Sequence, residues 1–170
     1  MRGIKAFSPD GKWIAFQSRR GGKDTIWKIP VDGGAPVQLT DKSSFRPLFS
    51  PDGKFISCAF YEEQVNPPRY RAAKIPADGG APFRVFDLPD TVNFGDGFWW
   101  TADGRALTYV DTRNDVSNIW SLRIDSANQS QLTNFSSKKV FYYALSPDGK
   151  SFAMARGAEV SDVVLIRDFR

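Results

Sequence analysis

Four apolar segments recur along the chain, each close behind a basic residue, at positions 13–16, 55–60, 106–110 and 152–155. Within them, apolar side chains occupy both alternating positions, as in Trp13-Ile14-Ala15-Phe16. A strand that is covered on one side only alternates apolar with polar residues, so this pattern predicts strands packed between neighbouring sheets. Residues 36–40 do alternate, which predicts an outer strand with one face in solvent.

A four-residue turn precedes each of these segments. Three copies read Ser-Pro-Asp-Gly, beginning at Ser8, Ser50 and Ser146, and the weaker Thr101-Ala102-Asp103-Gly104 fills the gap. Proline presets φ for a type I turn, aspartate bonds to amides ahead of it, and glycine supplies the positive φ that reverses the chain. Structural roles are therefore predicted for Asp10, Gly11, Asp52, Gly53, Asp103, Gly104, Asp148 and Gly149. The four aspartates lie 42, 51 and 45 residues apart, a spacing typical of propeller blades.

The units share one plan: a short inner strand, the apolar strand, a third strand and an outer strand. The last two are joined by an Asp-Gly-Gly turn at Asp32 and again at Asp78. This plan predicts an all-β protein, a β-propeller of about four blades, with units near 1–40, 45–87, 97–135 and 139–170.

The fourth unit is predicted to end with the apolar strand Val163 to Ile166 and to lack its outer strand. An open apolar edge is a template for pairing with another chain. We therefore expect the chain either to be part of a larger propeller or to self-associate through this edge.

Variable loops are expected to gather on the face of the disc opposite the short turns, because strand direction alternates along each blade. These loops are residues 19–24, 41–46, 62–71, 88–98, 111–117, 136–139 and 157–161. In 62–71, the pair Pro67-Pro68 is predicted to stop strand pairing. Loops on a rigid scaffold often carry recognition, which makes a protein or peptide the expected partner. The candidate binding residues are Arg46, Arg69, Tyr70, Arg71, Asp90, Asp96 and Arg113, for which solvated loop charge is the simpler interpretation.

Composition narrows the function classes. Aromatic residues make up 14% of the chain, which favours β architecture, and the formal charge of +4 comes from scattered basic pairs, so no nucleic-acid partner is expected. With no histidine, Ser-His-Asp and Cys-His catalysis and most zinc sites are excluded, and no catalytic residue, metal or cofactor is expected.

We expect no membrane span and no signal peptide in this chain, which leaves a periplasmic or a cytoplasmic location open. Cys58 is predicted to be a buried structural thiol.

Two other features invite a chemical interpretation. The repeated aspartates could suggest metal binding, but residues one blade apart cannot converge on one ion. Their spacing also differs by one residue from the sialidase Asp box. Trp13, Trp27, Trp100 and Trp120 could stack on sugars, although packing between blades explains them better, and Trp99 is likewise assigned to the core.

The repeated Ser-Pro-Asp-Gly-Lys turn, the Ile-Trp strands at Ile26-Trp27 and Ile119-Trp120, and the Pro-x-Asp-Gly-Gly turn resemble the TolB-type propeller repeat. This repeat is similar in form to WD repeats and occurs in TolB, in gating propellers of prolyl-oligopeptidase-like peptidases, and in sensor parts of bacterial kinases and winged-helix regulators. The ending Ser161 to Arg167 looks like that of the last group. The third unit departs from the pattern at Thr101-Ala102 and at Arg123 to Ala127, so its register is the least defined.

The resemblance implies a non-catalytic recognition or assembly module. The alternative is a regulatory or gating propeller of a larger enzyme. No Gly-x-Ser-x-Gly nucleophile motif occurs in the chain, so any catalytic domain would lie outside it. A third hypothesis, a lectin-like ring, predicts sugar binding through exposed tryptophans.

Overall fold

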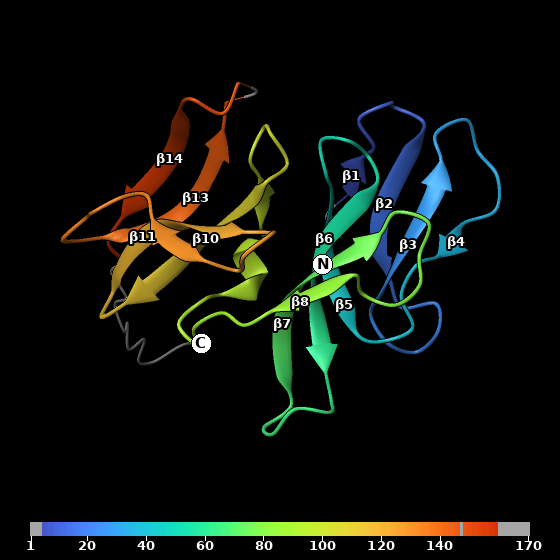
Figure 1. The fold of residues 1–170 in the computed structure, drawn as a ribbon, viewed down its shortest axis with the longest axis horizontal. Helices are drawn as coiled ribbons and strands as arrows, with labels where there is room; N and C mark the ends of the chain where they lie inside the picture. Colours follow the sequence, from blue (N-terminus) through green and yellow to red (C-terminus); the bar gives the residue numbers. More distant parts are fainter. Residues whose placement is uncertain (1–4, 147, 160–170) are drawn as a thin grey trace, which may run out of the picture.

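The computed structural model describes residues 5–146 and 148–159, and its strands form separate antiparallel sheets arranged side by side (Figure 1). We call these sheets blades 1 to 4 in chain order. Blade 1 has the strand order β1-β2-β3-β4, blade 2 β5-β6-β7-β8, blade 3 β9-β10-β11-β12, and the described part of blade 4 has β13-β14. The predicted all-β propeller fold is therefore confirmed. The predicted strand Val163 to Ile166 lies outside the described residues.

The strand bounds follow the plan expected from the sequence. In blades 1 and 2 they are β1 Lys5–Phe7, β2 Trp13–Ser18, β3 Thr25–Pro30, β4 Val37–Gln38, β5 Ser44–Phe49, β6 Phe55–Glu62, β7 Arg69–Pro76 and β8 Arg84–Phe86. In blades 3 and 4 they are β9 Trp99–Trp100, β10 Ala106–Arg113, β11 Val116–Arg123, β12 Gln129–Gln131, β13 Lys139–Leu145 and β14 Phe152–Gly157. A short 3-10 helix, η1 (Phe94–Asp96), precedes β9.

The two rims of the arc differ as predicted. The turns β1–β2, β5–β6, β9–β10 and β13–β14 lie at the top of Figure 1, and the β6–β7 hairpin projects from the opposite rim. In blade 2, the Ser50 hydroxyl donates to the Asp52 carboxylate (2.5 Å), which also accepts the Lys54 amide (3.1 Å). The weaker copy at Thr101 makes the same bond to Asp103 (2.6 Å), so a hydroxyl and a carboxylate suffice without proline.

Two predicted loops are strands in the structure. β6 and β7 stay paired out to Glu62 opposite Arg69, so the expected loop 62–71 shrinks to residues 63–68. The prolines do not interrupt the ladder because they lie in the hairpin tip, beyond its last pair. The expected loop 111–117 is reduced in the same way to the two-residue turn Asn114-Asp115, where both residues have positive φ (49° and 61°), as a type I′ hairpin requires.

The core consists of three layers between successive blades. Ala6, Ala15 and Ile26 of blade 1 cluster with Phe49, Ile56 and Cys58 of blade 2. Further layers join blade 2 to blade 3 and blade 3 to blade 4. Cys58 is completely buried, which confirms the predicted structural thiol. In blades 2 and 3 the sheets are therefore covered on both faces, which explains the apolar residues at both alternating positions of their second strands.

Tryptophans take part in these layers unevenly. Trp100 is buried, and its indole N–H donates to the Leu48 carbonyl of the preceding blade (3.1 Å). Trp13, Trp27 and Trp120 are half-buried, and the first and last of these pack beside a core layer. Among the described residues, no helix is long and apolar enough to cross a membrane.

Candidate functional site

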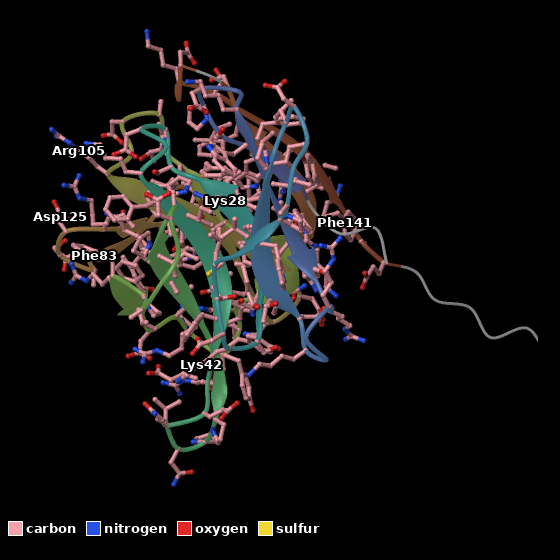
Figure 2. The ribbon with its side chains drawn as sticks, turned by 90° about the vertical axis from the view of Figure 1, so that its right-hand side faces the viewer. Lys28, Lys42, Phe83, Arg105, Asp125 and Phe141 are labelled. Atoms are coloured by element: carbon pink, nitrogen blue, oxygen red, sulfur yellow. The ribbon has the colours of Figure 1, made fainter. Side chains whose placement is uncertain are left out.

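A cavity of about 390 Å³ lies between blades 2, 3 and 4, and most of its lining residues are on the inner strands β5, β9 and β13, which border the central channel of a propeller. Its lining consists of Arg46, Asp96, Trp99, Val110, Phe141, Tyr142 and Tyr143. Figure 2 shows Phe141 on the opposite side of the molecule from Phe83 and Asp125. The cavity brings together two of the predicted binding residues, Arg46 and Asp96.

Arg46 reaches the cavity because the β5–β6 ladder is interrupted. The pairing register shifts between Phe45 and Leu48, and Arg46 within this bulge has φ of 60°. Bulges re-aim a side chain out of its regular direction. The Arg46 chain passes over Gly97, where an added Cβ would lie 3.7 Å from the Arg46 Cδ. None of the ion pairs among the described residues includes Arg46, and burial lowers the pKa of its guanidinium.

Asp96 is placed by η1. The Asn93 side chain caps this turn by accepting the Gly95 amide (2.9 Å), and its amide group donates to the Asp96 carboxylate (3.1 Å). Burial raises the pKa of Asp96, and the Arg46 charge and the Asn93 hydrogen bond only partly oppose this shift. The cavity thus pairs a permanent cation with a carboxyl group that protonates at a higher pH than usual.

Aromatic side chains form the rest of the wall. The Trp99 ring meets the rings of Tyr142 and Tyr143 edge-on, with centroids 6.3 Å and 6.4 Å apart. Tyr143 is buried and donates its hydroxyl to Thr108 (3.0 Å), whereas Tyr142 remains 60% exposed. An amphipathic aromatic wall beside an arginine is typical of peptide-binding surfaces.

The predicted residues Arg69, Tyr70 and Arg71 lie on β7, away from this cavity. Arg71 pairs with Glu62 (2.5 Å) and Asp87 (2.9 Å), and Arg69 pairs with Asp87 (2.9 Å). The Tyr70 ring packs against Phe45 and Tyr61, with both centroid distances 4.9 Å. These partners hold the base of the hairpin, so the arginines are already neutralised within the chain.

The remaining two predicted residues are also separate from the cavity. Arg113 pairs with buried Asp111 (2.7 Å) and lies over the Trp120 ring, 5.2 Å from its centroid. Asp90 is exposed on the connection between β8 and β9. The structure therefore brings Arg46 and Asp96 together at the cavity. The other five candidates lie outside it.

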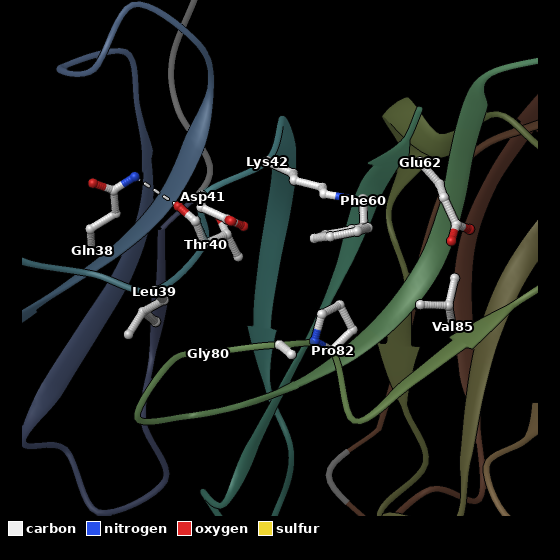
Figure 3. Close-up of a pocket in the computed structure, with 11 residues that line it drawn as sticks. Gln38, Leu39, Thr40, Asp41, Lys42, Phe60, Glu62, Gly80, Pro82 and Val85 are labelled. Atoms are coloured by element: carbon white, nitrogen blue, oxygen red, sulfur yellow. Dashed lines mark hydrogen bonds between the residues drawn. The ribbon is translucent and has the colours of Figure 1, made fainter. Parts of the chain in front are cut away.

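A larger groove of about 710 Å³ separates blades 1 and 2 near their outer strands (Figure 3). Leu39, Phe60 and Val85 are among its apolar lining residues, and the Lys42 side chain reaches toward the Phe60 ring (5.9 Å to the centroid). Its Glu62 is already paired with Arg71. The groove is roomier than the channel cavity, but none of the seven predicted binding residues lines it, whereas Arg46 and Asp96 both line the cavity. We therefore take the cavity as the candidate site.

The sequence interpretation missed the aromatic wall. The sequence singles out neither Phe141 nor Tyr142. Trp99 does pack against the core layer between blades 3 and 4, as predicted, but it also lines the cavity. One signal was present: a run of three aromatic residues on an inner strand must direct side chains to both faces, of which only one can pack on blade 3. Among the described residues, no group of three or more potential metal-ligand side chains lies close together.

These blades, turns and interfaces define a TolB-like β-propeller. The chain superposes on a solved protein from Agrobacterium tumefaciens provisionally named TolB, with a TM-score of 0.75 and 25% identity over 93% of this chain and 55% of that one. TolB from Acinetobacter baumannii matches with a TM-score of 0.62 and 23% identity over 88% of this chain and 36% of that one.

Sequence comparison gives a consistent result. The uncharacterized protein Atu1656 of Agrobacterium fabrum is 34% identical over 111 residues, which cover 61% of this chain and 38% of that protein. No protein-family model matches the sequence. The chain thus spans about half of the Agrobacterium tumefaciens protein and less than half of the other two relatives.

Proposed function

We propose that this chain is a non-catalytic recognition module that binds a peptide or protein segment at the channel cavity. The observation that carries the proposal is Arg46, a partly desolvated guanidinium that forms no ion pair with any residue the structure describes, next to the aromatic wall of Trp99 and Tyr142. Guanidinium groups recognise carboxylates with two parallel hydrogen bonds, and this recognition strengthens away from water. The ligand that fits is a peptide carboxylate with an aromatic or apolar neighbour.

The lining also supports the non-catalytic part of the proposal. Among the described residues that line the cavity there is no cysteine and no serine, and the chain has no histidine to act as a general base. Tyr143 has a raised pKa because it is buried, so its hydroxyl stays protonated at neutral pH. The lining residues can position and neutralise a ligand but offer no activated nucleophile.

The test is selection from a random peptide library on immobilised protein, followed by titration of the enriched peptides. We expect enrichment of sequences with a carboxylate beside an aromatic residue. Arg46→Met should weaken binding about tenfold or more, because a charge-assisted pair is lost. Arg113→Met is the matched control, because Arg113 is already paired with Asp111.

Three results would contradict this proposal. They are no enrichment, equal weakening by both arginine substitutions, and a hydrolase domain encoded in the reading frame next to this segment. The last result would favour a gating propeller of an enzyme.

A further inference from the structure

Lys28 and Lys74 occupy the same position on the third strand of successive blades. Each ammonium lies over the ring of the aromatic residue that begins the second strand of its blade. The distance to the ring centroid is 4.4 Å from Lys28 to Trp13 and 3.6 Å from Lys74 to Phe55. In blade 2 the Phe83 ring lies 5.0 Å from the same ammonium and 5.4 Å from the Phe55 ring. We call the set Phe55, Lys74 and Phe83 the Lys74 patch.

The blade 1 lysine has a carboxylate partner in the next blade. Lys28 pairs with Asp78 of blade 2 at 2.7 Å. Asp125 holds the same place in blade 3, because the amides of the preceding residues, Ala77 and Ile124, each donate to the carbonyl of the residue that follows the turn glycine of their own blade (2.9 Å each). If the pattern were repeated, Asp125 would pair with the lysine of blade 2.

In blade 3 this carboxylate is taken by a different cation. The Arg123 guanidinium lies 2.6 Å from the Asp125 carboxylate, and the corresponding residue of blade 2 is the uncharged Pro76. Arg84 of the outer strand β8 connects blade 2 to blade 3 instead, by donating to the carbonyls of Ile124 (2.7 Å) and Asp125 (2.5 Å). The link between the blades is therefore made without the lysine.

Lys74 is a cation with unused hydrogen-bonding capacity. None of the ion pairs among the described residues includes it. Burial lowers the pKa of its ammonium, and the charge of Asp52 opposes this shift only in part. Asp52 is engaged in its own turn, where it accepts the Ser50 hydroxyl and the Lys54 amide. An ammonium has three donors, so a carboxylate from outside the chain would find a partner here.

The rim where blades 2 and 3 meet is basic and partly apolar. Figure 2 shows Phe83, Asp125 and Arg105 along the same side of the molecule, and Phe83 is 66% exposed. Both blades have four strands in the described part of the chain, so a missing neighbour does not account for this exposure. Five basic residues of this rim face three aspartates, an excess of two positive charges: Lys54, Lys74, Arg84, Arg105 and Arg123 against Asp52, Asp103 and Asp125.

We propose that the Lys74 patch binds an acidic segment of a partner protein. A carboxylate of the partner takes the place beside Lys74 that Asp78 takes beside Lys28, and an apolar side chain of the partner packs on Phe83. Such a charge-assisted pair strengthens where the cation is partly removed from water. The proposal is independent of peptide binding at the channel cavity, since Phe141 of that cavity lies on the opposite side of the molecule from Phe83 (Figure 2).

A nucleic acid fits this rim less well than an acidic peptide. Phosphates repeat along a nucleic-acid strand, and the three aspartates between the basic residues would repel them. Each of these aspartates accepts a hydrogen bond from the residue two positions before it, so their negative charges stay in place: Asp52 from Ser50, Asp103 from Thr101 and Asp125 from Arg123. A single carboxylate needs only the ammonium of Lys74.

The experiment titrates the capped tripeptide acetyl-Glu-Phe-Glu-amide into the isotope-labelled chain and follows the backbone amide signals of Lys74 and Phe83 by NMR. We expect saturable shifts at both residues. The neutral peptide acetyl-Gln-Phe-Gln-amide should bind about tenfold more weakly, and Lys74→Met should weaken the acidic peptide by about the same factor. Lys74→Arg should retain most of the binding, because it keeps the charge. Phe83→Ser should weaken binding about fivefold, because an aromatic contact is lost.

Matched controls separate this site from a general charge effect and from the channel cavity. Lys23→Met changes an exposed lysine of blade 1 and should leave binding unchanged. Arg46→Met removes the cation of the cavity, and the shifts at the Lys74 patch should persist in this variant. The signals of Trp99 and Tyr142 report the cavity in the same titration, so either site can fail without the other. Melting temperatures of all variants verify that they are folded.

Four outcomes would overturn the proposal. Equal binding of the acidic and neutral peptides would mean that no carboxylate is recognised. Unchanged binding by Lys74→Met would exclude the lysine as its partner. Loss of the shifts at the patch in Arg46→Met would place the peptide in the channel cavity. Tighter binding of a thymidine oligonucleotide, lost in Lys74→Met, would assign the patch to nucleic acid.

Discussion

The ammonium of Lys28 on blade 1 lies 2.7 Å from the carboxylate of Asp78 on blade 2. Lys28 is buried and lies over the Trp13 ring, 4.4 Å from its centroid, whereas Asp78 is exposed in its Asp-Gly-Gly turn. The pair connects two blades near their outer strands, and Lys28 is labelled in Figure 2. Because one partner is solvated, most of the stabilisation should come from the buried lysine.

We predict unequal effects for the two halves of this pair. Asp78→Asn should lower the free energy of unfolding by less than about 1 kcal/mol, as expected for a solvated carboxylate. Lys28→Ala should cost more, about 2 kcal/mol, because it also removes packing and the cation–π contact with Trp13. Chemical denaturation of both variants checks this, and equal losses would show that the ion pair dominates.

The four turn aspartates predict acid sensitivity. Hydrogen bonds from turn hydroxyl groups, then from backbone amides, hold the pKa of Asp10, Asp52, Asp103 and Asp148 below the ordinary 3.8. The unfolded chain therefore binds more protons than the folded chain near and below that pH. This stabilisation is complete above the unfolded pKa and is lost as pH falls through the folded values. Melting temperature should be steady from pH 7 to 5 and drop below about pH 4.

The substitution Asp52→Ala measures how much one turn aspartate contributes to stability. Asp52→Ala removes the acceptor of the Ser50 hydroxyl and the Lys54 amide and should cost about 1 kcal/mol in unfolding free energy. Asp32→Ala is the control, because Asp32 is an exposed turn residue. It should change stability by less than about 0.5 kcal/mol. Similar losses at both positions would show that the hydroxyl–carboxylate bond does not stabilise the turn.

Peptide binding should respond to pH in the opposite direction from stability: because of Asp96, affinity should rise as pH falls. The pKa of Asp96 is raised by burial, so it gains a proton as pH falls while other carboxyl groups are still ionised. Protonation removes negative charge beside Arg46, and affinity for a peptide carboxylate should then rise. Titration by calorimetry at a series of pH values, from 7 down toward the ordinary 3.8 of a free aspartate, tests this. Asp96→Asn should bind with nearly constant affinity, and an unchanged pH profile in this variant would assign the effect to another group.

Cys58 should be inert in the folded protein. Burial raises the pKa of its thiol to about 12, and the side chain has no exposed surface. Both factors suppress the reactive thiolate. Ellman's reagent at pH 8 should detect no thiol in native protein and one thiol per chain in denaturant. Rapid labelling of native protein would show that the layer between blades 1 and 2 opens readily.

The hairpin tip should be dispensable for stability. Residues 63–68 lie beyond the last pair of the β6–β7 ladder, and replacing them with Asn-Gly retains the link between Glu62 and Arg69. Melting temperature should change by only a few degrees. A large decrease would indicate that the tip itself stabilises blade 2, and loss of peptide capture with unchanged stability would move the binding site to the tip.

Local chemistry explains why the fold was predictable. Each turn is closed by a hydroxyl, an aspartate and a glycine within four residues. The conformation of the turn at Ser50, Asp52 and Gly53 can therefore be predicted from these residues alone. The length of the β6–β7 ladder was not predictable in this way, because Pro67 and Pro68 stop pairing only if they lie inside it.

The candidate site depended on relations that no single segment contains. Arg46 reaches the cavity through a bulge, Asp96 through a 3-10 turn, and Tyr142 through the packing of blade 4 on blade 3. Their chemistry marked Arg46 and Asp96 as candidates, but their proximity follows from the way blades 2 to 4 meet. For the same reason, the exposed charges Arg69 and Arg113 could not be distinguished in advance from Arg46.

The turns of this chain contact the turns of adjacent blades, and this affects how the number of blades can change during evolution. Gly53 lies against Pro9, Gly104 against Pro51 and Gly149 against Ala102, so each of the last three turns contacts the turn before it. Stability in such an array approximates a sum of nearest-neighbour terms. Gene duplication or deletion of a whole unit would then change one junction rather than the entire molecule, which lets the number of units drift among descendants of a common ancestor.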